Sequence, residues 1–548
     1  MASASSISEA LEVSAGVSRL GFTFLEGDGG ARDFTWSEIS EQTAQTARAL
    51  LRLGVRPGDR VAMLAEDPCE FALCALGAIR AGLVAVPLAP PPMLGAIDAY
   101  VERLGPMLEI SGAGALLVPQ RHLERLAASL QSYLAEPARV LSYDDVKRQH
   151  GGYAIAIPTT ASADDPCFLQ FTSGSTGRPR AVTVTHGNVL ANTEATHRLL
   201  GTDPSEEIGV NWVPLYHDMG FVATLLAPTL GLGRHVFIPT SFFATRPRIW
   251  LETVHRYRGT MTTSNNFGLR IAAKRPPRIP DLDLSCVRAL IVGSEPIKVD
   301  VLRTFEATYR AHGFDSRALC PAYGMAEATL VISMSPADET YSTAAISDGG
   351  EVVSCGRVLP GHEVMVLDDQ GASGSTGIGE LAYRGPSVTP GYWESSTGST
   401  RTDGPRWLRT GDLGFVRDGQ LYVCGRAKDV IIIGGRNYHP QAIEWCAEAV
   451  SGVQPDGVIA AAIPGETSDR VVIVAEVAGD TDLDATRRDI AWSIKNSFGF
   501  SPEAVCLIER WSLPRTTSGK RRRSDVAKAY LAGGLKQLAR SGGHDERI

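Results

Sequence analysis

FLQFTSGSTGRPR, residues 168–180, is the stretch around which the rest of the chain can be understood. Its first four residues are mostly apolar and predict a buried strand, and hydroxyls and glycines follow over residues 172–177. Glycine lets backbone N–H groups point inward, and converging N–H groups and hydroxyls bind phosphate oxygens. Such strand ends are where α/β sheets bind ligands. The stretch indicates a phosphate-binding loop. The residues alone also fit a plain Gly/Ser connector. They do not form the P-loop motif GxxxxGK[ST], because no Lys-Ser or Lys-Thr ends the loop.

Size and composition predict a globular protein with two or more domains. A chain of 548 residues is too long for one hydrophobic core, and 44% apolar and 21% charged residues are ordinary values. The net charge of −8 gives no general attraction to nucleic acid or anionic lipid, so we expect neither as a partner. No apolar run approaches about 18 residues and the N-terminus lacks signal-peptide features, so we expect a cytoplasmic protein without a membrane span.

The cysteines give no sign of a metal site or a disulfide framework. All nine are scattered along the chain, without a CxxC pair or zinc-type Cys/His spacing. Their odd number and their mostly apolar surroundings predict buried thiols in a reducing compartment.

Alternating strands and helices predict a parallel sheet in the first part of the chain. Residues 34–53 have helical periodicity, with Ser37 as the expected N-cap and Gly54 directly after the helix. In the same way we expect strands at residues 60–64, 83–88 and 225–230, a helix at 69–80, and a helix at 98–104 that stops before a Gly-Pro pair.

Polar or aromatic residues follow the ends of four predicted strands. Besides the loop after residue 171, these are VNWVPLYHDMG at residues 210–220, the Gly-Ser-Glu-Pro that ends the strand at 287–293, and LCPAYGMAE at 319–327. One such strand end is common, but four in one chain indicate a composite ligand site.

The chain changes character after residue 352, and this change sets the predicted fold class. Short strands separated by Gly/Asp turns indicate a β-rich section, a small barrel, up to about residue 427. Strands and helices alternate again over residues 429–548. We therefore predict an α/β protein with a large N-terminal domain of parallel-type sheets, residues 1–427, and a small α+β C-terminal domain, residues 429–548.

Five motifs carry a family resemblance: TSGSTG, YGMAE, RTGDLG, GRAKD and TTSGK, in this order. The chain resembles the adenylate-forming superfamily over about residues 34–527. That superfamily includes acyl-CoA synthetases, firefly luciferase, peptide-synthetase adenylation domains and fatty acyl-AMP ligases. The chain is most similar to the fatty acyl-AMP ligases, through WVPLYHDMG, SEPI, SCGRVLPG, GGRNYHPQAIE and VAVPLAPPP.

The resemblance implies a two-step reaction with ATP and Mg²⁺ as cofactors. A hydrophobic carboxylic acid would attack the α-phosphorus of ATP, so that acyl-AMP forms and pyrophosphate leaves. The acyl group would then pass to the phosphopantetheine thiol of a separate acyl carrier protein. Two alternatives stay open: an acyl-CoA ligase, and a nucleotide-binding scaffold without catalysis.

The same resemblance assigns roles to residues on the nucleotide side. Asp412 would accept the ribose hydroxyls, since a carboxylate offers two acceptor oxygens. Arg426 would reach the ribose or the phosphates, and Glu327 would bind Mg²⁺. The phosphate loop would comprise Thr172, Ser173, Gly174, Ser175, Thr176 and Gly177, and the adenine site Gly293, Ser294, Glu295, Pro296, Tyr323, Gly324 and Met325.

Further roles concern the acid and the C-terminal domain. Lys520 would bridge the carboxylate and the α-phosphate as a point charge on a flexible stem. His217 would stand between the ATP and acyl sites. Lys428 would be the hinge about which a mobile C-terminal domain rotates between the two steps. The helix expected around residues 212–227, which includes Trp212, would line the acyl pocket together with Asn266 and Phe267. Packing in the core is the alternative role for these residues.

Each of these residues also has an ordinary structural explanation. Lys520 begins the basic run KRRR, and such runs are usually solvated. Glu327 alone fits a helix-capping carboxylate, and Asp412 alone fits a turn. His217 alone fits a packed histidine, and Lys428 an exposed lysine.

The chain departs from the family pattern at two places. Arg180 stands where the family usually has Lys, and the two cations differ in geometry. The segment between Glu327 and Gly356 spans 29 positions. It is shorter than the insertion of typical fatty acyl-AMP ligases, which is thought to disfavour CoA. The choice of acceptor is therefore open.

Overall fold

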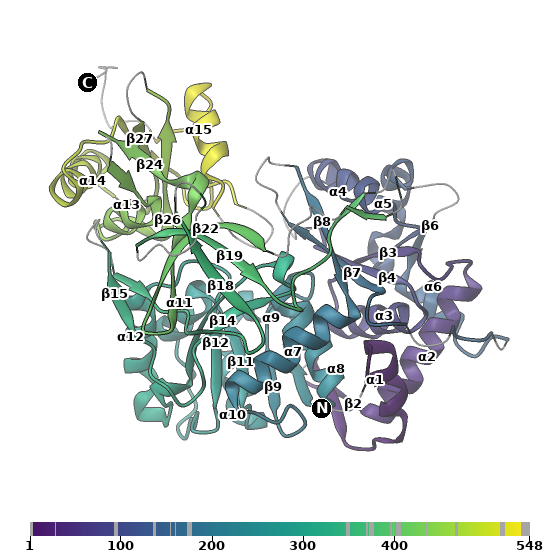
Figure 1. Ribbon diagram of the computed structural model, residues 1–548. Coiled ribbons are helices and arrows are strands. Elements are labelled where there is room, and N and C mark those ends of the chain that lie inside the picture. Colours follow the sequence, from purple (N-terminus) through teal and green to yellow (C-terminus); the bar gives the residue numbers. More distant parts are fainter. Residues whose placement is uncertain are drawn as a thin grey trace.

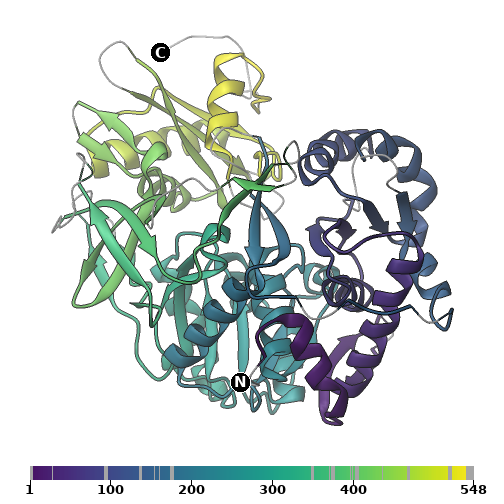
Figure 2. The same ribbon diagram turned by 45° about the vertical axis from the view of Figure 1, so that its right-hand side comes forward.

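The computed structural model shows two large sheets and a smaller C-terminal unit (Figures 1 and 2). The structure describes residues 4–27, 29–91, 97–134, 139–153, 155–158, 161–172, 178–346, 351–368, 371, 377–394, 397, 399–401, 407–434, 436–465, 469–479, 481–515 and 521–538.

The first large sheet has eight strands, of which β7, β4, β3, β5 and β6 run parallel. Its strand order is β21 (Ser399–Arg401), β20 (Gly391–Glu394), β8 (Arg180–Thr185), β7 (Pro166–Thr172), β4 (Val84–Leu88), β3 (Arg60–Leu64), β5 (Ala115–Val118) and β6 (Arg139–Ser142). The parallel sheet predicted from the β-α-β pattern is confirmed.

The second large sheet has nine strands with a parallel centre and antiparallel edges. Its order is β17 (Arg357–Val358), β14 (Val331–Met334), β13 (Leu319–Gly324), β12 (Ala289–Val292), β11 (Met261–Ser264), β9 (Ile208–Asn211), β10 (Arg234–Phe237), β1 (Leu20–Leu25) and β2 (Ala31–Thr35). All of β12 is buried, as its apolar sequence predicts.

Helices fill the space between the two sheets and cover their outer faces. Those packed between the sheets include α1 (Ile7–Val13), α2 (Trp36–Arg52), α3 (Pro68–Arg80), α7 (His186–Leu200) and α8 (Ala227–Gly231). The outer helices include α4 (Ile97–Ser111) and α5 (Leu123–Leu130) on the first sheet, and α10 (Ile249–Tyr257), α11 (Asn266–Lys274) and α12 (Val299–Tyr309) on the second. Shorter helices are α6 (Tyr143–Arg148) and α9 (Thr240–Thr245).

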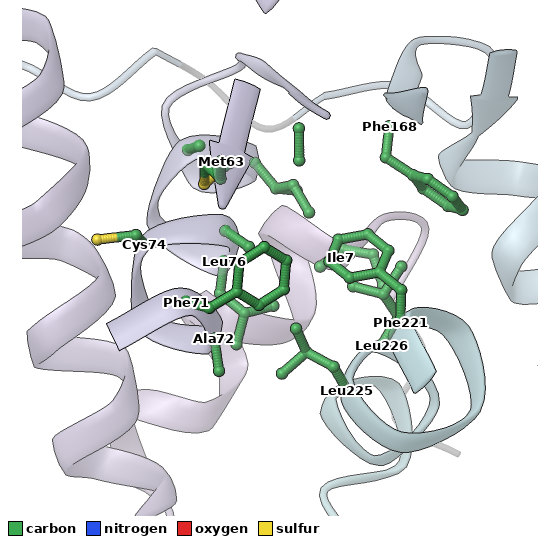
Figure 3. Packing of buried hydrophobic residues seen from close by; sticks show 14 of the residues in the cluster. Ile7, Met63, Phe71, Ala72, Cys74, Leu76, Phe168, Phe221, Leu225 and Leu226 are labelled. Carbon is green, nitrogen blue, oxygen red and sulfur yellow. The ribbon is translucent and has the colours of Figure 1, made fainter. Parts of the chain in front are cut away.

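Aromatic side chains from three distant segments meet in the core between the sheets (Figure 3). The ring of Phe221 lies 4.9 Å from that of Phe168 and 5.9 Å from that of Phe71, edge to face in both cases. Burying one such side chain contributes about 1.5–3 kcal/mol. Phe168 belongs to β7, so this packing fixes the strand that leads into the predicted phosphate loop.

Three sequence predictions in this part were wrong at the level of single elements. Helix α2 begins with a capping box of Thr35 and Glu38, not with Ser37 as N-cap. Helix α4 continues through Pro106 to Ser111, because Tyr100, Leu104 and Leu108 bury one face of it and this packing outweighs the cost of the proline.

The third correction concerns residues 225–230, where a strand was predicted. They belong to a π-helix, η4 (Met219–Leu226), and to α8. Nearly all residues of both helices are buried, so the sequence lacks the polar face that distinguishes a helix from a buried strand.

The β-rich section after residue 352 is an antiparallel sheet of four strands: β18 (Glu363–Leu367), β19 (Gly379–Arg384), β22 (Leu408–Arg417) and β23 (Gln420–Arg426). The described strands form an open sheet rather than the barrel predicted, because residues 354–356, not β18, hydrogen-bond to the free edge of β23. Hairpin β15 (Thr343–Ala345) and β16 (Glu351–Val353) packs against β23.

The C-terminal unit runs from β24 (Ile431–Ile433) to α15 (Arg523–Leu531). It contains β25 (Arg436–Tyr438), α13 (Pro440–Glu448), β26 (Val453–Ile463), β27 (Arg470–Val477), α14 (Leu483–Phe498) and β28 (Ala504–Ile508). Strand β27 alternates between two buried faces, with Ile473 toward α13 and α14 and Val472 toward α15. Figures 1 and 2 show the unit above the two large sheets. The predicted α/β class with a small α+β C-terminal part is confirmed.

Each of the nine cysteines carries a thiol rather than a disulfide, and seven of them are buried. Among the described residues, no group of three or more His, Cys, Asp and Glu side chains could hold a metal ion. None of the described helices combines the length and apolar character that crossing a bilayer requires.

Candidate active site

The four predicted strand ends line one cavity of about 950 Å³. Gln170 to Thr172 come from the end of β7, and His217 to Met219 follow β9. Gly293 to Pro296 follow β12, and Tyr323 to Glu327 lie at the end of β13. The carboxyl ends of both large sheets therefore open into the same space, where α/β folds bind ligands.

Asp412 is held by two neighbours from separate segments. The phenol of Tyr323 donates a hydrogen bond of 2.6 Å to Asp412 Oδ2, and Arg426 Nε lies 3.1 Å from Oδ1. Asp412 is 6% exposed, and it pairs with Arg426 across β22 and β23. Burial, and then the Asp412 charge, raise the pKa of Tyr323 well above its ordinary value, so the phenol stays a donor. The carboxylate thus faces the cavity in a fixed orientation.

Glu327 is oriented by a residue that sequence reasoning missed. The hydroxyl of Tyr392, on β20, donates a hydrogen bond of 2.8 Å to Glu327 Oε1. The guanidinium of Arg180 lies 3.2 Å from the centre of the Tyr392 ring, a cation–π contact. All three side chains line the cavity. Glu327 Oε2 makes no hydrogen bond to the part of the chain that the structure describes.

That free oxygen is compatible with a bound Mg²⁺. Magnesium prefers hard oxygen ligands and commonly uses one or two carboxylates together with phosphate oxygens and water. One carboxylate that faces a ligand cavity and is held by a phenol meets this requirement.

The loop after β12 is fixed by Asn266. Its amide Nδ2 donates a hydrogen bond of 2.8 Å to the carbonyl of Pro296. Its Oδ1 accepts a hydrogen bond of 3.0 Å from the backbone N–H of Lys298. Its own backbone N–H donates 3.0 Å to Glu295 Oε1. Ser294 has φ +73°, a left-handed conformation uncommon outside glycine and typical of ligand sites. Asn266 therefore shapes the predicted adenine loop and also lines the cavity, and its predicted role in the acyl pocket stays a prediction.

His217 lies at the start of the π-helix η4. Its Nδ1 lies 2.6 Å from Asp218 Oδ1, and its side chain is 19% exposed. Gly220 permits this turn, because a Cβ there would lie 2.0 Å from the carbonyl oxygen of Pro214. π-Helical segments occur frequently at functional sites. The arrangement holds the imidazole at the cavity wall.

Trp212 and Phe267 are not among the described residues that line the cavity, and their role in the acyl pocket stays a prediction. The Trp212 ring stacks on Phe243 at 3.7 Å and belongs to the core cluster that also contains residues of α10 and α11. Phe267 is 43% exposed on α11.

The cavity extends instead between α7 and the nine-stranded sheet. Thr193 and Thr196 line it from α7, and Asn211, His235 and Thr263 line it from the sheet. The hydroxyls of Thr193 and Thr196 are buried, and neither has a hydrogen-bond partner among the described residues. This deep part of the cavity, called the inner chamber below, is polar but carries no charge of its own on these five residues.

The C-terminal unit also contributes side chains to the cavity. The backbones of Arg515 and Arg521 form an isolated antiparallel β-bridge. Both side chains line the cavity, as does Lys428. Lys428 lies in the short turn Ala427–Asp429 between the β-rich section and the C-terminal unit. Lys520 itself, and five of the predicted phosphate-loop residues, Ser173, Gly174, Ser175, Thr176 and Gly177, lie outside the described residues.

The chain is similar to known proteins in family, in sequence and in structure. The AMP-binding enzyme family matches residues 13–393. A putative acyl-CoA synthetase of Caulobacter vibrioides is 34% identical, over 91% of this chain and 90% of its own length. A long-chain-fatty-acid–AMP ligase of Mycolicibacterium smegmatis is 31% identical, over 94% of this chain and 92% of its own length.

A solved structure agrees with the sequence comparison over the whole fold. It comes from work on fatty acyl-adenylate ligases of E. coli and L. pneumophila, and it is 30% identical with a TM-score of 0.88. The match covers 97% of this chain and 98% of that one. The chain therefore belongs to the AMP-binding enzyme family and is an acyl-adenylate-forming ligase.

Proposed function

We propose that this cavity binds ATP and a carboxylic acid side by side and that the acyl group then passes to the phosphopantetheine thiol of a carrier protein. The observation that carries the proposal is the convergence on one cavity of four strand ends, an oriented Asp412, an oriented Glu327 and the chain beside Lys520. A carboxylate oxygen attacks the α-phosphorus, the bond to the β-phosphate oxygen breaks, and pyrophosphate leaves. The thiol then attacks the acyl carbonyl, loses its proton and displaces AMP.

On the nucleotide side, Asp412 accepts the ribose hydroxyls. A carboxylate has about four acceptor positions, and the contacts to Tyr323 and Arg426 each use one of them. Tyr323 and the loop from Gly293 to Pro296 flank the adenine. Preorganised partners of this kind need no rearrangement when charge develops in the transition state.

On the phosphate side, Thr172 and the residues up to Gly177 hold the β- and γ-phosphates. Glu327 binds Mg²⁺, and Tyr392 keeps its carboxylate in place. Mg²⁺ bound to Glu327 would neutralise part of the phosphate charge. Lys520 donates to the acid and the α-phosphate, and Arg180 adds positive charge at the same wall of the cavity.

The inner chamber receives the tail of the acid. Burial lowers the pKa of His235 to about 3 and that of His197, at the same chamber, to about 4, so both imidazoles are neutral hydrogen-bonding groups at neutral pH. Unpaired buried hydroxyls on Thr193 and Thr196 are costly unless a ligand satisfies them. We therefore assign an acid whose tail is largely hydrophobic and carries a hydroxyl or keto group.

The experiment is acid-dependent ATP–pyrophosphate exchange with pairs of acids that have equal chain lengths, with and without a hydroxyl or keto group. We expect exchange with fatty acids and higher kcat/KM for the substituted member of a pair. Exchange with no acid of the panel would favour the non-catalytic scaffold and overturn the proposal.

The acceptor is tested separately, because the two relatives carry the names of an acyl-CoA synthetase and an AMP ligase. With acid, ATP and CoA, we expect acyl-AMP to accumulate and little acyl-CoA to form. Steady release of the CoA thioester would favour the acyl-CoA ligase instead.

A further inference from the structure

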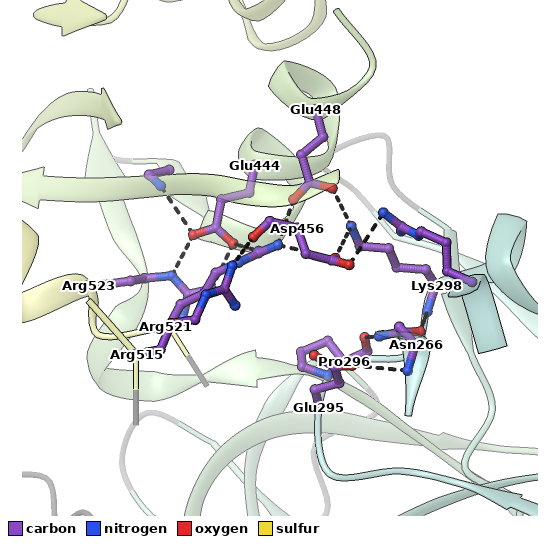
Figure 4. Close-up of polar contacts among 12 residues, drawn as sticks. Asn266, Glu295, Pro296, Lys298, Glu444, Glu448, Asp456, Arg515, Arg521 and Arg523 are labelled. Atoms are coloured by element: carbon purple, nitrogen blue, oxygen red, sulfur yellow. Dashed lines mark hydrogen bonds and ion pairs between the residues drawn. The ribbon is translucent and has the colours of Figure 1, made fainter. Parts of the chain in front are cut away.

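A cluster of charged side chains joins the large N-terminal part to the C-terminal unit (Figure 4). We call the five side chains of Arg270, Lys298, Glu448, Asp456 and Arg521 the ion cluster. Lys298 Nζ pairs with Glu448 and lies 3.1 Å from Asp456 Oδ1, and Arg270 Nη1 lies 3.3 Å from Asp456 Oδ2. From the other side, Arg521 Nη2 lies 2.6 Å from Glu448 Oε1 and 3.5 Å from Asp456 Oδ1.

The ion cluster is largely withdrawn from water. The side chains of Lys298 and Glu448 are 7% and 8% exposed, and that of Arg521 is 13% exposed. Burial would raise the pKa of Asp456, but Lys298, Arg270 and Arg521 together hold it below its ordinary value. A buried charge that loses its partner is strongly unfavourable, so these side chains depend on one another.

The positions of the two cations connect the cluster to the predicted site. Lys298 directly precedes α12, and its backbone N–H is held by Asn266, which also holds the loop at Pro296. Arg521 is the residue after Lys520 and also pairs with the fully buried Glu444 at 2.6 Å. The two carboxylates Glu448 and Asp456 therefore lie between the adenine loop and the chain beside Lys520.

We propose that Lys298 is a positioning residue for the adenylation step, whose ammonium group docks the C-terminal unit with Lys520 at the cavity. The inference rests on the proposed role of Lys520. Lys298 touches neither the reacting atoms nor a substrate in this scheme. It acts through Glu448, Asp456 and Arg521.

An ionic contact suits a unit that has to dock and leave. Replacing a buried ion pair by apolar residues is often neutral for stability, whereas removing one partner is not, so such pairs specify a geometry more than they add net stability. When the unit moves away, the charges return to water and no unpaired charge stays buried. The contact is thus specific while docked and costs little to separate.

The test compares Lys298→Met, Lys298→Arg and Glu448→Gln in the full-length enzyme by ATP–pyrophosphate exchange, with an acid that the wild type uses. Methionine keeps a long apolar stem without the charge. We expect Lys298→Met to lower kcat on the order of tenfold or more with little change in the KM for ATP, since fewer molecules are docked. Lys298→Arg retains most of the rate because the charge remains.

A matched control lies on the helix that follows Lys298. Arg303 pairs with Glu351 at the surface, with side chains 60% and 42% exposed, and Arg303→Ala should leave exchange unchanged. Glu448→Gln should reproduce the Lys298→Met defect, and the double variant should be no worse than the more impaired single one. The comparison is valid if the unfolding temperature of each variant stays within a few degrees of that of the wild type. If Lys298→Met does not fold, Glu448→Gln takes its place in the test.

The outcomes separate this inference from the proposed function. If Lys520→Ala abolishes exchange while Lys298→Met stays within twofold of the wild type, Lys298 has no docking role and the inference is overturned. A Lys298→Met variant whose KM for ATP rises while its kcat is unchanged would overturn the inference as well. If Lys520→Ala is fully active, the proposed catalytic role of Lys520 fails first.

Discussion

Asp412→Asn tests the nucleotide site most sharply, because the change keeps the shape of the side chain and removes its charge. In the structure Asp412 is 6% exposed and is already held by Tyr323 and Arg426. Each hydrogen bond from a ribose hydroxyl to the carboxylate is worth about 1.5–3 kcal/mol. Asparagine keeps one acceptor oxygen, so we expect a loss of about 2 kcal/mol, which is roughly thirtyfold in kcat/KM for ATP.

The assay is ATP–pyrophosphate exchange with ATP and with 2′-deoxy-ATP. Wild type should discriminate against the deoxynucleotide, since Asp412 would lose a donor, and Asp412→Asn should discriminate much less. Folding should change by no more than about 1 kcal/mol, because Arg426 is 46% exposed and water screens its charge. A fall of less than threefold with ATP, or unchanged discrimination in the variant, would refute the ribose assignment.

The remaining predictions concern the catalyst, the hinge, the core and the inner chamber. Lys520→Ala should nearly abolish adenylate formation with little change in the unfolding temperature; adenylation near the wild-type rate would argue against its role. Lys428→Pro should spare adenylation and block transfer to the thiol, and equal loss of both steps would contradict the hinge assignment. Phe221→Ala should lower the free energy of unfolding by about 3–5 kcal/mol in urea titration, because it empties a fully buried site; a change below about 1 kcal/mol would show that the core refills. Thr193→Val should reduce the preference for hydroxy acids over plain acids of equal length, and an unchanged preference would remove Thr193 from substrate recognition.

The sequence predicted the elements that have a clear period or clear punctuation. The β-α-β pattern around α3 and the buried strand β12 are recovered in the structure with shifts of one or two residues at their ends. The prediction from the sequence failed where tertiary packing decides the secondary structure. Pro106 lies inside α4 because the helix buries one face, and residues 225–230 are helical because buried helices and buried strands share the same apolar composition.

For the site, the sequence pointed to strand ends but not to the side chains that hold them in place. Tyr392 orients Glu327 from 65 positions away, and Lys298 meets Glu448 from 150 positions away. No local pattern marks such pairs, because a single tyrosine or lysine looks the same on any surface. Trp212 lies within a site motif of the sequence, and its ring packs in the core cluster of the nine-stranded sheet.

A crystal structure with a non-hydrolysable acyl-adenylate, an acyl sulfamoyl adenosine, tests the central claim most directly. The account predicts adenine between Tyr323 and the loop from Gly293 to Pro296, ribose hydroxyls on Asp412, the acyl tail in the inner chamber and Lys520 at the acyl–adenylate linkage. An analogue bound outside this cavity, or a Lys520 ammonium remote from it while the ion cluster is intact, would contradict the account.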